Sequence, residues 1–161
     1  MTKKILMVCM GNICRSPMAE AIMRRALERT KATDEWFVDS AALVGYHSGC
    51  LPEERALDVL QKHGITYSKE ARVIRPDDFL EFDFIFGMDS DNVAELKKIS
   101  PSNCKAKIML LGTYGLAETE KNIHDPYYFL GEAPFEEVYE KCVVACNAFI
   151  QDVVLKNPSC S

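Results

Sequence analysis

A short apolar run, followed at once by a loop that begins with a cysteine, limits the folds available to this chain. Residues 5–8 are continuously apolar, which predicts a buried strand of a parallel sheet. The segment from Cys9 to Pro17 follows, and Ser16 before Pro17 predicts a helix with Ser16 as its N-cap. The strand therefore delivers Cys9 to a tight loop at a helix N-terminus. Unpaired N–H groups and the helix dipole favour an anion such as phosphate there.

The residue types in this loop suit nucleophilic chemistry on a phosphate. Cys9 is the candidate nucleophile, because a helix N-terminus and a nearby arginine stabilise a thiolate. Arg15 carries a planar set of donors that can bind two phosphate oxygens and stabilise the charge of a transferring phosphoryl group without a metal ion. Ser16 can donate a hydrogen bond to the thiolate. We therefore expect no cofactor and no metal.

The other loop residues are predicted to bind phosphate mainly through their backbone. Gly11, and with it Asn12, can adopt the positive φ angles that turn successive N–H groups inward. The predicted substrate-binding residues of the loop are Met10, Gly11, Asn12, Ile13, Cys14 and Ser16. The alternative interpretation is that Cys9 is simply a buried cysteine beside a structural arginine. The strand before the loop, the glycine inside it and the Ser-Pro dipeptide at its end argue against this alternative.

The rest of the chain alternates strands and helices. After the first helix, the pattern predicts strands at 36–42, 82–88 and 107–111, and helices at 52–63, 89–100 and 135–154. This alternation predicts one α/β domain spanning residues 1–161, a four-stranded parallel twisted sheet with helices on both faces. Ligands of such sheets bind beyond the carboxyl ends of the strands, where Cys9 lies. The tail, residues 156–161, is expected to fray.

Composition limits the classes of function and partner. A net charge of −5 and a pI near 5.3 argue against nucleic acid or an acidic membrane as a partner. The basic start of the chain is followed by too short an apolar stretch for a signal peptide. Seven cysteines, an odd number, favour a reducing cytoplasm over a disulfide framework. We expect a cytoplasmic protein, and a monomer.

A long predicted loop, residues 112–134, holds the second group of candidate residues. Asp125, fixed by Pro126, could protonate a leaving oxygen and then activate water; equally, the Asp-Pro dipeptide could merely begin a turn. Tyr127, and Tyr46 in the turn-rich segment 45–52, could stack on a phenyl ring and favour phosphotyrosine over phosphoserine. Packing within its own loop is the alternative role for Tyr46.

Three motifs together resemble the low-molecular-weight protein tyrosine phosphatases. They are the segment 9–17, Val38-Asp39-Ser40-Ala41-Ala42 and Asp125-Pro126-Tyr127-Tyr128, and the resemblance covers nearly the whole chain. It implies a cytoplasmic phosphatase that forms a phosphocysteine intermediate and acts on phosphotyrosine proteins and small aryl phosphates. It also favours Asp125 as the general acid and an aromatic wall at Tyr46. Tyr127 and Tyr128 resemble positions that are phosphorylated in the family.

The resemblance further implies residues behind the loop. Ser40 is expected to brace Asn12, so that the loop N–H groups point inward before charge develops. The chain departs from the family at Lys69, where a histidine often pairs with the glutamate that aligns with Glu20, and we expect a salt bridge between Lys69 and Glu20 instead. Leu43-Val44 replaces small hydroxyl residues, a departure that bears on substrate preference.

Two questions stay open from the sequence. Cys14 either captures an oxidised Cys9 as a reversible disulfide or is a packed thiol. The competing functions are a phosphate-binding module without turnover and an arsenate reductase on the same fold. The reductase needs two further redox cysteines near the pocket, and residues 86–89 contain none.

The three histidines are not expected to act directly. His63, before Gly64, is predicted to lie at a helix end, near the negative end of the dipole. His47 and His124 are expected to face solvent.

Overall fold

The computed structural model describes residues 2–156, and its centre is a sheet of four parallel strands in the order β2-β1-β3-β4. The strands are β1 (Lys3–Cys9), β2 (Trp36–Ala42), β3 (Phe84–Gly87) and β4 (Lys107–Leu110). Cys9 pairs with Ala42, and Val8 pairs with Gly87. The carboxyl ends of the three neighbouring strands therefore meet at one edge, and the predicted four-stranded parallel sheet is confirmed.

The middle of β1 is buried on both sides, which explains its unbroken apolar run. Ile5 and Met7 belong to the larger core cluster, whereas Leu6 and Val8 belong to the smaller one, and all four side chains are fully buried. Side chains alternate across a strand, so an interior strand with helices on both faces needs apolar residues at every position.

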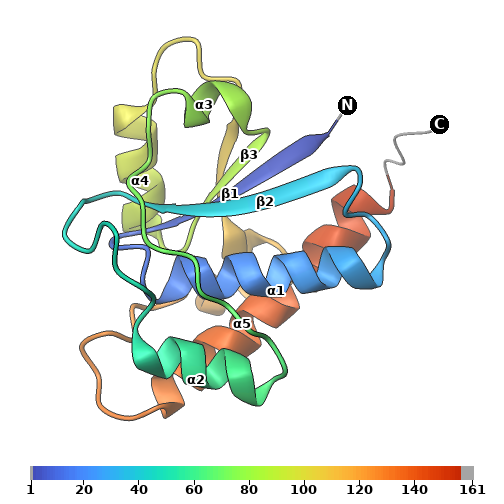
Figure 1. Cartoon of the computed structure of the whole chain (residues 1–161). Helices are drawn as coiled ribbons and strands as arrows, with labels where there is room; N and C mark the ends of the chain where they lie inside the picture. The colour runs from blue at the N-terminus through green and yellow to red at the C-terminus, as the bar shows by residue number, and fades with distance from the viewer. Residues whose placement is uncertain (1, 157–161) are drawn as a thin grey trace.

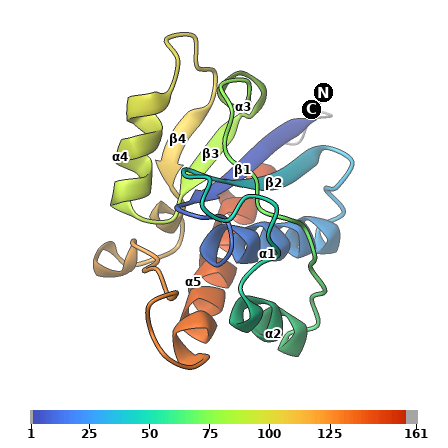
Figure 2. The same cartoon turned by 60° about the vertical axis from the view of Figure 1, so that its left-hand side comes forward.

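Helices cover both faces of the sheet, as predicted (Figures 1 and 2). One face carries α1 (Arg15–Arg29), α2 (Glu54–Lys62) and α5 (Ala133–Phe149), with α1 packed on β1 and β2. The other face carries the short α3 (Asp78–Glu81) and α4 (Ser90–Ile99), which packs on β3 and β4.

The predicted start of the first helix is wrong by two positions. The helix begins at Arg15, with Cys14 as the N-cap, rather than after Ser16. The Ser16 hydroxyl does not cap the helix because it is bonded to the Asn12 amide and lies beside the Cys9 thiol. Similarly, α2 begins at Glu54 rather than Pro52, since the Glu53 side chain accepts the backbone N–H of Arg55.

The bounds of several later elements also differ from the predicted ones. Residues 78–81 form α3, so β3 begins only at Phe84. The predicted loop 112–134 contains two short 3₁₀ turns, η1 (Leu111–Thr113) and η2 (Glu118–Glu120), and α5 begins at Ala133. After Phe149 the last helix continues as the π-helical turn η3 (Ile150–Val154). The expected frayed tail lies, from residue 157 on, outside the described residues.

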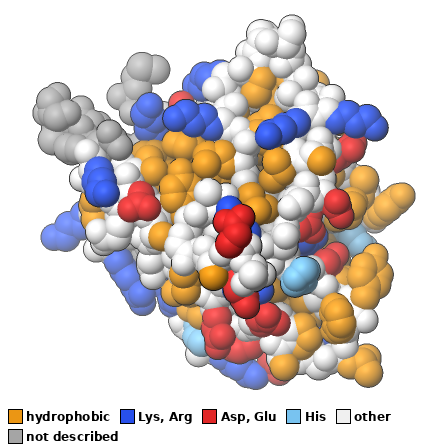
Figure 3. All heavy atoms as spheres, turned by 180° about the vertical axis from the view of Figure 1, so that it is seen from behind, with side chains coloured by type: hydrophobic (Ala, Val, Ile, Leu, Met, Phe, Trp, Pro, Cys, Tyr) orange, Lys and Arg blue, Asp and Glu red, His pale blue; other side chains and the backbone are white. Residues whose placement is uncertain are grey.

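The surface carries both signs of charge. Figure 3 shows the face opposite to Figure 1, and acidic side chains gather near its lower end, where α2 and the start of α5 lie in Figure 1. Across residues 2–156, no helix combines the length and apolar character needed to cross a membrane.

Candidate active site

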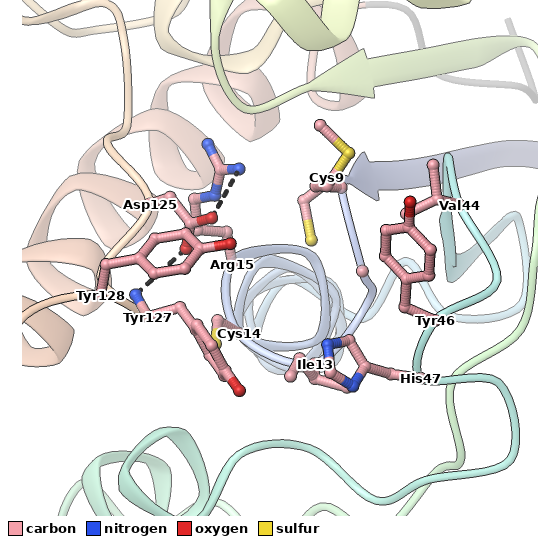
Figure 4. Close-up of a pocket in the computed structure, with 12 residues that line it drawn as sticks. Cys9, Ile13, Cys14, Arg15, Val44, Tyr46, His47, Asp125, Tyr127 and Tyr128 are labelled. Atoms are coloured by element: carbon pink, nitrogen blue, oxygen red, sulfur yellow. Dashed lines mark hydrogen bonds and ion pairs between the residues drawn. The ribbon is translucent and has the colours of Figure 1, made fainter.

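A cavity of about 350 Å³ opens at the carboxyl edge of the sheet, above the N-terminus of α1 (Figure 4). Three chain segments build it. The loop after β1 forms the floor, the segment after β2 one wall, and the loop before α5 the other wall. Its lining residues are Cys9, Met10, Gly11, Ile13, Cys14, Arg15, Val44, Tyr46, His47, Asp125, Tyr127 and Tyr128. The structure thus brings the predicted catalytic residues to one place.

The Cys9 thiol lies at the floor of this cavity and is held by Ser16. Cys9 Sγ lies 3.1 Å from Ser16 Oγ and accepts the backbone N–H of Ser16 at 3.4 Å. Ser16 Oγ also accepts the Asn12 side-chain amide at 2.8 Å, which leaves its O–H free to donate to a thiolate. Asn12 and Ser16 are buried beneath the loop, and their side chains do not line the cavity.

Asn12, not Gly11, supplies the left-handed backbone of the loop. Asn12 has φ of 58°, whereas Gly11 is absent from the positive-φ residues of the described chain. The expectation of a positive φ at Gly11 is therefore wrong. Gly11 is needed for space instead, since a Cβ there would lie 2.9 Å from the His47 ring. Asparagine adopts the left-handed region more readily than other non-glycine residues.

Arg15 is buried and anchored from two other segments. Its Nη1 donates to Asp89 Oδ2 at 2.6 Å and to the carbonyl of Ile123 at 2.9 Å. Burial alone would lower the pKa of Arg15, but the nearby Cys9, with Asp89 and Asp125, raises it above its ordinary value. Among the described residues its Nε has no hydrogen-bond partner although it is buried. A buried donor without an acceptor is costly, and a bound oxyanion would satisfy it.

Asp89 is a site residue that the sequence reasoning missed. It is the N-cap of α4, where its side chain accepts the backbone N–H of Asn92 at 2.8 Å, while its other oxygen binds Arg15. An acidic residue at the carboxyl end of a parallel strand was the available signal. Its partner could not be read from the sequence because 74 positions separate the two residues.

Asp125 reaches the cavity from the opposite wall to Tyr46. Its Oδ2 lies 3.7 Å from Arg15 Nη2, and its Oδ1 accepts the backbone N–H of Tyr127 at 3.1 Å. The second bond is the Asx turn that an Asp-Pro segment favours. The predicted turn is therefore present, and Asp125 lines the cavity.

Aromatic side chains form the rim of the cavity. Figure 4 shows Tyr127 and Tyr128 beside Asp125, with Val44, Tyr46 and His47 across the opening. Tyr46 is 85% exposed, so it does not pack its own loop and is free to contact a ligand. His47 is half-buried, lies 6.0 Å from the Tyr127 ring and lines the cavity, so the expectation that it faces solvent is wrong.

The other histidines lie outside the cavity. His124 is exposed, as predicted. His63 is the C-cap of α2, as predicted, and it pairs with Glu136 and stacks on the Tyr139 ring at 3.8 Å.

A buried polar network braces the loop from behind. Asn12 Nδ2 donates to Ser40 Oγ at 3.0 Å, and Ser40 Oγ donates to Glu20 Oε1 at 2.6 Å. The predicted bracing of Asn12 by Ser40 is thus seen in the structure. Lys69 Nζ lies 3.7 Å from Glu20 Oε1, which matches the expected ion pair, but its closer partner is Asp39 at 2.5 Å.

Tyr67 is a second residue of this network that sequence reasoning missed. Its hydroxyl donates to Glu20 Oε1 at 2.7 Å. Burial, followed by the charge of Glu20, raises the pKa of Tyr67, so the phenol stays protonated and remains a donor. Glu20 is fully buried, and its carboxylate is satisfied by Tyr67, Ser40 and Arg24.

Arg72 connects the loop to the outer part of the same network. Its backbone N–H donates to Asn12 Oδ1 at 3.1 Å, and its guanidinium pairs with Asp39 and Asp78. Burial tends to raise the pKa of Asp39, but the hydrogen bond and charge of Lys69 prevail and lower it. A backbone N–H 60 positions along the chain therefore holds the loop asparagine, and ion pairs of Arg72 with Asp39 and Asp78 hold that segment.

The other cysteines near the site are buried thiols. Burial, reinforced by the nearby Cys9, raises the pKa of Cys14 far above its ordinary value. Burial likewise raises the pKa of Cys142, on α5, to about 12. Both side chains are free, as is Cys9, so the structure contains the reduced form of the loop.

The fold and the site define an α/β phosphatase with its anion pocket between the first strand and the first helix. Residues 4–158 match the family described as low molecular weight phosphotyrosine protein phosphatase. The chain belongs to this family.

Individual relatives agree with this assignment. Low molecular weight phosphotyrosine protein phosphatase 2 of Drosophila melanogaster is 51% identical over 94% of this chain and 93% of its own. The crystal structure of Primo-1 superposes with a TM-score of 0.93 at 47% identity, covering 95% of this chain and 99% of that one. The crystal structure of a Drosophila arginine phosphatase has a TM-score of 0.87 at 38% identity, covering 92% and 96%.

Proposed function

We propose that this protein hydrolyses phosphotyrosine in proteins, and small aryl phosphates, through a phosphocysteine intermediate on Cys9. The observation that carries the proposal is the convergence of Cys9, Arg15 and Asp125 on one cavity. A thiol on the floor, a guanidinium beside it and a carboxyl group at the wall are the nucleophile, the charge stabiliser and the proton donor that this reaction requires.

In the first step the Cys9 thiolate attacks phosphorus in line with the leaving oxygen. The S–P bond forms as the P–O bond to the phenol breaks, and Asp125 transfers its proton to the departing oxygen. Arg15 and the inward N–H groups of the loop stabilise the charge on the equatorial oxygens. The unpartnered Nε of Arg15 supports this role, because the phosphate supplies the acceptor that this buried donor lacks.

In the second step Asp125, now ionised, takes a proton from water as that water attacks the phosphocysteine. The S–P bond breaks, inorganic phosphate leaves and the thiolate of Cys9 is restored. Ser16 assists by donating its O–H to the leaving thiolate, from 3.1 Å. One carboxyl group thus serves as acid and then as base, which returns the enzyme to its starting protonation state.

The shape of the cavity favours an aryl phosphate. The reactive sulfur lies at the floor, whereas Tyr46 and Tyr127 stand at the rim, so a phenyl ring spans the depth between them and stacks on these side chains. A phosphoserine side chain is too short to bring its phosphate to the floor while its backbone stays outside the rim. Val44 lines this wall and makes it apolar.

The wider setting follows from the same reasoning. The odd number of cysteines in the sequence favours a reducing compartment, so we place the enzyme in the cytoplasm. We further propose that it is a monomer without a cofactor, with residues 1–161 acting as one domain. Tyr128 is 83% exposed beside the cavity, which supports it as a phosphorylation site.

The test is the release of inorganic phosphate from a phosphotyrosine peptide and from its phosphoserine counterpart, with a chelator present. We expect turnover of the phosphotyrosine peptide only, loss of activity in Cys9→Ser, and a fall of about 10²-fold or more in Asp125→Ala. A phosphoarginine peptide is included, because one relative is named an arginine phosphatase. Faster turnover of that peptide would replace the proposed substrate class. A wild-type protein that binds phosphate but never releases it from either peptide would be a recognition module.

A further inference from the structure

The loop that carries Asp125 contains little regular structure of its own. Between η2 and α5, residues 121–132 belong to no helix or strand, with turns and bends at 127–132. Within 125–131, two hydrogen bonds join residues that are close in sequence. They run from Tyr127 N–H to Asp125 Oδ1 and from Phe129 N–H to the carbonyl of Pro126. These bonds shape the turn. Before the turn, the loop is tied to the floor of the cavity by Arg15, which bonds the Ile123 carbonyl at 2.9 Å and pairs with Asp125 at 3.7 Å. The segment after Asp125 is held from another element.

Arg55, the second residue of α2, contacts the loop at three carbonyl groups. Its Nη1 donates to the carbonyls of Phe129 at 2.5 Å and Gly131 at 3.1 Å, and its Nη2 donates to that of Tyr127 at 3.2 Å. A planar guanidinium can bond several acceptors at once, whereas the ammonium of a lysine is a compact point charge. The three bonds lie directly after Asp125 in the chain.

The guanidinium is itself held in place. Its Nε donates to Glu53 Oε1 at 2.7 Å, and its carbon lies 4.4 Å from the centre of the Phe135 ring. The carboxylate and the ring fix the direction of the donors that face the loop. The side chain of Arg55 is 24% exposed, and the residues whose carbonyls it binds lie at the protein surface.

The same helix start also holds the phosphate loop. The backbone N–H of Glu53 donates to the carbonyl of Ile13 at 2.8 Å. The bond of Glu53 to the phosphate loop and the bonds of Arg55 to the loop of Asp125 therefore start from the same end of α2. Through them α2 connects the loop that holds the nucleophile to the loop that holds the candidate acid. The N-terminal end of α2 therefore joins the two halves of the site, in addition to the contacts of Arg15 with Ile123 and Asp125.

We propose that Arg55 is the positioning residue of the acid loop, which keeps the Asp125 carboxyl group within reach of the leaving oxygen. The inference rests on the proposed function. Arg55 does not contact the substrate, and it does not stabilise the charge that develops on the reacting atoms. Its effect is confined to steps in which Asp125 moves a proton, so it depends on how strongly the leaving group needs one.

The test compares two substrates that differ in this need. The phenolate released from phenyl phosphate is basic and needs a proton, whereas 2,4-dinitrophenolate leaves without protonation. For both substrates kcat/KM reports formation of the phosphocysteine. In Arg55→Gln and Arg55→Lys we expect kcat/KM to fall about 10-fold or more for phenyl phosphate and to stay within about 2-fold for the dinitrophenyl ester. The lysine variant keeps the charge but loses the three-carbonyl geometry.

The matched control is Lys62→Gln. Lys62 lies at the other end of α2 and pairs with Glu132, at the end of the same loop, without touching the backbone of 127–131. We expect no substrate-dependent change there. The inhibition constant for inorganic phosphate should be unchanged in all variants, because the phosphate loop is intact. Should Arg55→Gln not fold, Glu53→Gln removes the carboxylate that orients Arg55 and should give the same difference between substrates at smaller size.

The outcomes separate this inference from the proposed function. Equal losses on both esters, or none on either, would overturn the role of Arg55. Asp125→Ala measured alongside should show the same split between substrates in larger form. If Asp125→Ala shows no split, the assignment of the acid fails. If it shows one and the Arg55 variants do not, only the positioning role fails.

Discussion

Asp89 Oδ2 lies 2.6 Å from Arg15 Nη1, and this contact joins the start of α4 to the phosphate loop. The Arg15 side chain is 3% exposed and that of Asp89 is 23% exposed, so the pair is largely shielded from water. The same carboxyl group caps α4 through its other oxygen. A residue that looks like an ordinary helix cap therefore also fixes the direction of the guanidinium.

We expect Asp89→Asn to lower kcat/KM for a phosphotyrosine peptide about 10-fold with little loss of stability. Asparagine caps a helix nearly as well as aspartate, so α4 should persist, whereas the charged hydrogen bond to Arg15 is weakened. Steady-state kinetics and thermal unfolding together separate the two roles. A loss of stability that accounts for the lost activity would contradict the prediction.

Tyr67 should stabilise the folded protein through its bond to the buried Glu20. We expect Tyr67→Phe to reduce the free energy of unfolding by about 1–2 kcal/mol, because a buried carboxylate loses one of its donors. Chemical denaturation measures this change. The control is Tyr114→Phe. Among residues 2–156 the hydrogen-bond partner of the Tyr114 hydroxyl is a sulfur, Met109 Sδ, at 3.9 Å, so that variant should be nearly neutral. Similar losses in both variants would count against the Glu20 bond.

Asp39 should make stability depend on pH in the acidic range. Its pKa is lowered in the folded state from the usual value of 3.8, chiefly by Lys69 against the opposing effect of burial. A lowered folded pKa means that the contribution is present above the unfolded pKa and is lost as the pH falls through the folded value. We expect the difference in unfolding free energy between wild type and Asp39→Asn to shrink as the pH falls below 4, measured in urea. A difference that is constant with pH would refute this.

The reversibility of oxidation should depend on Cys14. Peroxide converts the Cys9 thiolate to a sulfenic acid, and condensation with the Cys14 thiol forms a disulfide and releases water. After peroxide treatment, we expect dithiothreitol to restore most of the wild-type activity but several-fold less in Cys14→Ser, where Cys9 proceeds to the sulfinic acid. The exposed Cys50 provides the control variant, Cys50→Ser, which should recover like wild type. Equal recovery in all three proteins would show that Cys14 is simply a packed thiol.

Local sequence patterns predicted much of this structure. The apolar run of β1, the Ser-Pro step near the start of α1 and the alternation of elements were sufficient for the parallel sheet with helices on both faces. They were sufficient also for placing Cys9 and Arg15 in one loop, because residues that are close in sequence stay close in space. The unusual length of its loop pointed to Asp125 as a candidate, but the orientation of Asp125 toward Arg15 was not predicted.

The predictions of helix starts and of side-chain exposure were wrong where a side chain has a partner that is not its neighbour in the sequence. Ser16 looks like a helix cap, yet its hydroxyl is bonded to Asn12, so the helix begins earlier. His47 looks like a surface residue, yet it packs over Gly11 and lines the cavity. Local propensity cannot reveal such partners, because they are brought together only when the loops close.

Local patterns in the chain were enough to predict the order of strands and helices, the nucleophile loop and the chemistry available in it. The bond of Arg15 to Asp89, the bonds of Asn12 to Ser40 and Arg72, and the bonds of Arg55 to the loop of Asp125 became visible only in the folded protein. The difference lies in distance along the chain. A hydrogen bond between residues tens of positions apart depends on the packing of whole elements, whereas periodicity and turn chemistry act within a few residues.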